Sequence, residues 1–95
     1  MANSSGPSIS SSGLDARRKK ILFRAWHRGI KEMDIVLGNF ADAHLPTMEE
    51  ADLDVLEHLM SAPDRELFKW ISGEEETPEE YRSHVMGRIA AFHNI

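Results

Sequence analysis

The sequence contains no cysteine among its 95 residues, which excludes disulfide bridges, thiolate metal ligands and cysteine nucleophiles. It also lacks a Gly-rich phosphate loop, a dinucleotide-binding fingerprint and a nucleophile elbow. No apolar run approaches the roughly 20 residues of a bilayer-spanning helix, so membrane insertion is not expected. The five histidines show no i, i+4 pairing, and no metal site is expected from them: His27, His44, His58, His84 and His93. These absences argue against an enzyme with its own catalytic centre.

Acidic and basic residues are unevenly distributed along the chain. The net charge is −5, yet residues 1–31 carry +6 and residues 32–95 carry −11. The basic segment has two interpretations. It is either a solvated helix face on an acidic protein, or a surface that meets an acidic partner or a phosphate-bearing group.

The first thirteen residues, MANSSGPSISSSG, are rich in Ser and Gly. Such a composition cannot bury enough apolar area to offset the entropy lost on ordering, so we expect a disordered, flexible tail over residues 1–13. Residues 14–95 have the length of a single domain. A domain of that size buries only about 60–65% of its unfolded surface, which allows one thin core. Function is therefore expected on the surface.

Apolar residues after the tail recur with the helical period, and no run alternates for long enough to predict a strand. We expect an all-α fold, a small five-helix bundle with short loops. The first two helices are expected over residues 14–27 and 30–44. Gly38, inside the second helix, is unfavourable there by about 1 kcal/mol relative to alanine and so indicates a close crossing with a neighbouring helix.

Capping signals predict where the later helices begin. Thr47 with Glu50, and Thr77 with Glu80, have the spacing of capping boxes for the third and fifth helices. The fourth helix is expected to be capped by Ser61 or Asp64 and to end at Gly73. Its aromatic residues, Phe68 and Trp70, are expected in the core, with a role as binding anchors left open for either one that is exposed.

The segment HRGIKEMD, between the first two helices, concentrates a glycine and opposed charges. One interpretation is structural, with Gly29 adopting a backbone conformation that a Cβ disfavours. The other is a docking site, because Arg28 can make a bidentate contact with a carboxylate or phosphate and Gly29 leaves space for another backbone. The candidate partner-binding residues are Arg28, Gly29, Lys31, Glu32 and Asp34.

Three blocks of the sequence resemble a known family: RGIKEMDIVLGNFA, PDRELFKWISG and the final IAAFH. They are similar to the succinate dehydrogenase flavinylation factors, the SdhE-type FAD assembly factors. The RGxxE motif of that family is present as Arg28, Gly29 and Glu32, within an RGxxExD pattern that ends at Asp34. The resemblance runs from Leu14 to His93.

The resemblance implies a five-helix chaperone that is not an enzyme. Such a protein binds the flavoprotein subunit of succinate dehydrogenase, and in some bacteria fumarate reductase, and promotes the covalent attachment of FAD. It implies no tightly bound cofactor, because FAD is handled in the partner flavoprotein. We further expect a monomer when free, no nucleic-acid binding, and the bacterial cytoplasm as the compartment, with the mitochondrial matrix as the alternative.

Two other functions stay open at this level. The stretch RRKKILFRAWHRG interleaves basic residues with Phe23 and Trp26, a pattern that a nucleic-acid-binding regulator could use to grip phosphates and stack on bases. Its helical period instead places Trp26 on an apolar stripe with Leu22. A free-standing FAD carrier is the other alternative, and the lack of a phosphate-binding loop counts against it.

Overall fold

The computed structural model describes residues 13–93, and in that range the chain is helical without any strand. The predicted all-α fold with five α-helices is confirmed, with two short 3-10 helices in addition. The predicted tail of residues 1–13 lies, apart from Gly13, outside the described residues. The elements are α1 (Ala16–Trp26), α2 (Lys31–His44), η2 (Leu45–Thr47), α3 (Glu50–Met60), α4 (Asp64–Ser72), η3 (Glu79–Tyr81) and α5 (His84–His93).

The helices gather into two compact units, one ending at Met48 and the other beginning at Glu49. The first unit holds α1, α2 and η2, and the second holds the remaining elements. The single domain over residues 14–95 stays a prediction.

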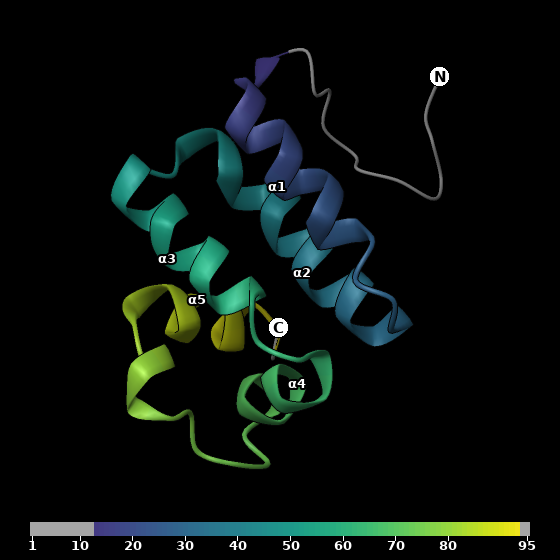
Figure 1. Ribbon diagram of the computed structural model, residues 1–95, viewed down its shortest axis with the longest axis vertical. Helices are drawn as coiled ribbons and strands as arrows, with labels where there is room; N and C mark the ends of the chain where they lie inside the picture. The colour runs from purple at the N-terminus through teal and green to yellow at the C-terminus, as the bar shows by residue number, and fades with distance from the viewer. Residues whose placement is uncertain (1–12, 94–95) are drawn as a thin grey trace. The chain divides into compact units, whose positions relative to one another are not determined.

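In the first unit, α1 and α2 run side by side in opposite directions (Figure 1). Their facing sides bury apolar side chains, because each helix repeats such residues with the period of one face. Gly38 confirms the predicted close crossing: a Cβ at this position would lie 2.3 Å from Cδ2 of the Trp26 ring. The buried side chains of the pair are Ile21, Leu22, Ala25, Met33, Val36, Leu37, Phe40 and Ala41.

Arg18, near the beginning of α1, forms hydrogen bonds with the last residues of the first unit. Its Nε donates to the Leu45 carbonyl at 3.0 Å, and its Nη2 donates to the Met48 carbonyl. Asp15 caps α1, because its Oδ1 accepts a hydrogen bond of 2.8 Å from the Arg18 backbone N–H. That hydrogen bond is the main cause that lowers the pKa of the Asp15 carboxyl below its ordinary value.

In the second unit, α5 packs against both α3 and α4. Asp52 of α3 links to α5 through His84, whose Nε2 lies 2.7 Å from Oδ1, and through Arg88 at 3.5 Å. The Tyr81 ring contacts the rings of His58 and Trp70, with centroid distances of 4.8 and 5.0 Å. The α3 stripe of Leu53, Leu56, Leu59 and Met60 is buried as its period predicts.

The start of α3 differs from the prediction. Thr47 does not cap α3; it belongs to η2, where its Oγ1 donates to the His44 carbonyl at 3.3 Å. Pro46 near the start of η2 presets a backbone dihedral that suits a tight turn, so the chain makes this turn before α3 begins. The N-cap of α3 is Glu49, which makes no capping hydrogen bond through its side chain.

The starts of α4 and α5 also differ from the prediction. Neither Ser61 nor Asp64 caps α4, whose N-cap is Pro63, although α4 ends at Gly73 as predicted, with φ +84°. The Thr77 signal precedes η3 rather than α5. The residue that performs the capping at α5 is Ser83, whose Oγ accepts a hydrogen bond of 3.0 Å from the Met86 N–H.

Candidate functional site

The joint between α1 and α2 is a sharp reversal made by four residues. Helix α1 ends at Trp26, and the N–H of His27 still donates to the Arg24 carbonyl at 3.2 Å. Gly29 then adopts φ +106°, a region that residues with a Cβ rarely occupy. Ile30 returns to an extended conformation as the N-cap of α2. The backbone therefore requires glycine at position 29.

The space around Gly29 is open. A Cβ built on it would meet no atom within 4 Å, and the residue is exposed. Glycine is therefore needed here for its backbone conformation and not for packing within the chain. The open space also leaves room for the backbone of another molecule to approach closely.

Asp34 has a role within the joint that the sequence did not reveal. Its Oδ1 accepts a hydrogen bond of 2.5 Å from the backbone N–H of Arg28, and the pair is partly buried. Because this bond closes the chain reversal on itself, Asp34 fixes the conformation of Arg28 and Gly29. The spacing of six residues carries no standard capping signature, so the sequence predicts only a partner-binding role for Asp34.

The other candidate residues lie on or next to the first turn of α2. Lys31 and Glu32 are exposed, and Arg28 is half-buried. Glu32 and Asp34 place negative charge in the first turn of α2, where it interacts favourably with the positive end of the helix dipole and stabilises the helix. The joint thus offers a cation, an exposed carboxylate and an open backbone within one short segment, a set suited to binding rather than to bond-making chemistry.

Phe23, which the sequence suggests only for nucleic-acid binding, and Ile35, for which it suggests no role, are both prominent on the surface. Phe23 on α1 is 62% exposed and Ile35 on α2 is 46% exposed. Phe23 falls outside the buried stripe formed by Ile21, Leu22 and Ala25, and that departure was the available signal. Trp70, in contrast, is buried as expected, and Phe68 is half-buried with its ring edge-on to His93.

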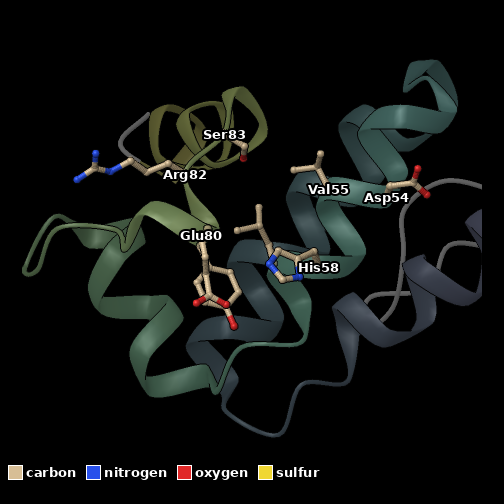
Figure 2. A pocket seen from close by; sticks show the side chains of 8 residues that line it. Asp54, Val55, His58, Glu80, Arg82 and Ser83 are labelled. Atoms are coloured by element: carbon tan, nitrogen blue, oxygen red, sulfur yellow. The ribbon is translucent and has the colours of Figure 1, made fainter.

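A pocket of about 230 Å³ lies in the second unit, between α3 and the segment that includes η3. Figure 2 shows Val55 and His58 on the α3 side and Glu80 on the η3 side, while the Arg82 side chain extends away from the other labelled residues. The remaining lining residues are Asp54, Leu59, Tyr81 and Ser83. Its volume is below the roughly 300–1,000 Å³ of pockets that enclose drug-sized ligands.

Two further findings concern residues 13–93. No group of three or more His, Cys, Asp or Glu residues in this range is arranged to hold a metal ion. Within the same part of the chain, none of the helices combines the length and apolarity needed to cross a bilayer. The expected absence of a metal stays a prediction.

The fold and the joint define a small all-α protein whose candidate site has the chemistry of a partner-binding surface. The family described as flavinator of succinate dehydrogenase matches residues 19–93. The chain belongs to this family of succinate dehydrogenase assembly factors, whose members are not themselves catalysts. The resemblance stated from the sequence is confirmed, and the match includes all five candidate residues of the joint.

The chain is similar to a protein named FAD assembly factor SdhE from Acetobacter pasteurianus, with 36% identity over 88 residues, 93% of this chain and 81% of the relative. It is also similar to proteins named succinate dehydrogenase assembly factor 2, mitochondrial. Identity is 35% to that of Dictyostelium discoideum, covering 79% of this chain and 53% of the relative. Identity is also 35% to the protein of that name from Danio rerio, covering 83% of this chain and 51% of the relative. The chain thus spans about half the length of these mitochondrial relatives. No solved structure matches the chain.

Proposed function

We propose that this protein binds the flavoprotein subunit of succinate dehydrogenase and promotes the covalent attachment of FAD to it. The observation that carries the proposal is the joint of residues 27–34, which keeps an open backbone at Gly29 beside a half-buried Arg28 and an exposed Glu32. Membership of the flavinator family supports flavinylation of succinate dehydrogenase as the reaction that binding at this surface promotes.

Each joint residue has a distinct part in the proposed contact. Arg28 donates to a carboxylate, phosphate or carbonyl of the partner, and its planar guanidinium fixes the orientation. Glu32 accepts from a partner donor, and Gly29 lets the partner backbone approach. Lys31 contributes charge at the rim. Asp34 acts indirectly, because it holds the Arg28 backbone in place.

The protein promotes flavinylation by positioning rather than by chemistry of its own. Joining a partner side chain to the flavin requires the two reactants and nearby charges to be held in register, and such positioning alone can lower a barrier by several kcal/mol. Binding to a flexible region of the flavoprotein would restrict it to the reactive arrangement. FAD itself stays in the flavoprotein.

The proposal includes a compartment and a state of assembly. The proposed compartment is the bacterial cytoplasm, with the mitochondrial matrix as the alternative, since proteins named for each setting are among the relatives. The free protein is a monomer. Binding to nucleic acid is not part of the proposed function, because the Trp26 ring packs against Gly38 and is not presented for stacking on bases.

Reconstitution of flavinylation tests the proposal. The purified flavoprotein subunit, free of flavin, is incubated with FAD in the presence and absence of this protein and then run on a denaturing gel that is read for flavin fluorescence. A covalent flavin band should form faster when the protein is present, and the two proteins should co-purify. A band of equal intensity and rate in both reactions would refute the proposal.

A matched pair of arginine variants tests the site. Arg28→Ala should weaken binding to the flavoprotein by about ten- to a hundredfold, since a hydrogen bond to a charged group contributes about 1.5–3 kcal/mol. Arg65→Ala, at an exposed position on α4, removes the same charge away from the joint and should leave affinity unchanged. Equal affinities of the two variants would remove Arg28 from the contact.

A titration of the isolated protein with FAD separates the assembly factor from a flavin carrier. The assembly factor should bind the flavoprotein and show no saturable heat with FAD alone. Tight FAD binding by the isolated chain would instead favour the carrier.

A further inference from the structure

Among residues 13–93, the large apolar side chains that stand exposed are Phe23 and Ile35. A single exposed apolar residue is ordinary on a protein surface and needs no explanation. These two, however, bracket the joint: Phe23 lies five residues before Arg28, and Ile35 lies six residues after Gly29. Their common location makes them a candidate pair.

The hairpin places both residues at a similar distance from the reversal. Phe23 is three residues from Trp26, the last residue of α1, and Ile35 is four residues from Lys31, the first of α2. With a rise of 1.5 Å per residue, Phe23 lies about 4.5 Å and Ile35 about 6 Å from its helix end. Since α1 and α2 run side by side in opposite directions (Figure 1), both residues lie near the end of the helix pair that carries the joint.

The exposed Phe23 ring is held in place. It stacks on the His27 ring with a centroid distance of 4.1 Å and an interplanar angle of 20°. The His27 ring is itself anchored, since its Nδ1 lies 2.7 Å from the Phe23 carbonyl oxygen. An aromatic side chain that is already ordered loses less conformational entropy when a partner covers it, which suits an anchor residue.

Charge around Phe23 indicates the chemistry of what covers it. Lys20 and Arg24 are exposed on the same helix and lie within one turn of Phe23. The acidic residue nearest to α1 in sequence is its cap, Asp15, which is occupied by hydrogen bonds from Arg18. A partner surface with carboxylates around an apolar recess would therefore be complementary to this face.

We propose that Phe23 and Ile35, flanked by Lys20 and Arg24, form a second contact region for the flavoprotein subunit, continuous with the joint. We name these four residues the joint-flanking patch. The two apolar side chains enter recesses of the flavoprotein, and acidic residues at the rim of those recesses pair with Lys20 and Arg24. This inference rests on the proposed function and extends the contact beyond the motif residues to the outer faces of both helices.

The test measures the affinity of purified variants for the purified flavoprotein subunit by calorimetry. Glutamine replaces each anchor, because it removes the apolar surface while keeping good helix propensity. Phe23→Gln should raise the Kd about tenfold, the factor equivalent to 1.4 kcal/mol, and Ile35→Gln should raise it several-fold. Phe23→Leu keeps an apolar side chain and should recover most of the loss. Circular dichroism confirms that each variant remains folded.

A charge-reversal pair tests the rim. Lys20→Glu combined with Arg24→Glu should weaken binding by more than tenfold, because like charges would then face each other. The control, Arg65→Glu on α4, reverses an exposed charge in the second unit and should leave the Kd unchanged.

The outcomes separate this inference from the proposed function. If the wild-type protein fails to bind the flavoprotein, the proposed function fails first. If the wild type binds and the glutamine variants bind equally well, the joint-flanking patch does not contact the flavoprotein, while the proposed function stands. Sedimentation that shows a dimer lost in Phe23→Gln, with flavoprotein affinity unchanged, would assign the patch to a second copy of this chain. Oligonucleotide binding lost only in the charge-reversal variant, again with flavoprotein affinity unchanged, would assign it to nucleic acid; either result overturns the inference.

Discussion

Gly29 and Gly87 are both exposed glycines with open space where a Cβ would stand, yet they differ in backbone conformation. Gly29 has φ +106°, whereas Gly87 lies within α5 without a positive φ. Gly29→Ala should therefore destabilise the fold by about 1–3 kcal/mol through backbone strain alone. Gly87→Ala should stabilise it by about 0.5–1 kcal/mol by lowering the entropy of the unfolded chain. Urea unfolding followed by circular dichroism measures both, and changes of the same sign would contradict this account.

Asp34 gives a second prediction at the scale of one residue. Asp34→Ala removes the acceptor of the partly buried Arg28 N–H and should destabilise the protein by about 1–3 kcal/mol. Asp34→Asn keeps an acceptor oxygen and should therefore lose less stability than Asp34→Ala. In hydrogen exchange by NMR, the Arg28 amide should exchange faster in Asp34→Ala than in the wild type.

The matched control for Asp34 is Glu32→Ala. Glu32 is an exposed carboxylate in the same first turn of α2, so its removal takes the same charge from the helix start without touching the bond to Arg28. The Arg28 amide should therefore keep its wild-type exchange rate in Glu32→Ala. Protection that is the same in both alanine variants would mean that the bond from Arg28 to Asp34 is unimportant.

The candidate site was predictable from the sequence only in part. The position of the reversal and the need for glycine followed from Gly29 interrupting two helical periods. The bond from Arg28 to Asp34 did not, because the conformation of the intervening residues decides whether a carboxylate six positions away can reach back. The exposure of Phe23, in contrast, could be predicted, because Phe23 falls outside the apolar stripe that holds Leu22 and Ala25.

At the scale of the elements, the Gly38–Trp26 contact holds the α1–α2 pair at a close distance. Gly38→Ala would place a Cβ 2.3 Å from the indole ring, so the ring or the helix must move. The expected loss of stability is about 1–3 kcal/mol, as for other overpacked cores. In a Trp26→Ala background the same change should be neutral or stabilising, by up to about 1 kcal/mol from helix propensity. A double-mutant cycle in urea measures the coupling, and additive effects would show that the two residues do not meet.

The elements also show where reading the sequence succeeds. The helices and their buried stripes follow from periodicity, because burial of one face dominates the energy of a short helix. Their starts were harder to predict, since a capping motif is local and competes with the turn that precedes the helix. Thr47 lies next to Pro46 within η2, and Thr77 lies next to Pro78, the N-cap of η3, so α3 begins only at Glu50 and α5 only at His84. Ser83 lacks a Glu or Gln three residues later, whereas Thr77 has Glu80, so the sequence favours Thr77 as the cap.

At the scale of the whole molecule, the division into two units coincides with a division of charge. Residues 1–48 carry a net charge of +3, and residues 49–95 carry −8. The joint and the joint-flanking patch belong to the positive part, whereas the acidic turn of Glu74, Glu75 and Glu76 belongs to the negative part. An acidic partner would therefore be attracted by one unit and repelled by the other, which favours a single orientation of docking.

The dependence of binding on salt tests this orientation. If the flavoprotein contacts the positive unit, raising the ionic strength from about 0.05 to 0.5 M should weaken binding several-fold, because screening at about 0.1 M already limits charge interactions to about 10 Å. The Lys20→Glu, Arg24→Glu variant should lose most of that dependence. Glu74→Lys combined with Glu76→Lys, at exposed positions of the acidic turn, should keep the slope although it changes the net charge by an equal magnitude in the opposite direction. Binding that strengthens with salt would place the partner on the acidic unit instead, and the contact through the joint would then be wrong.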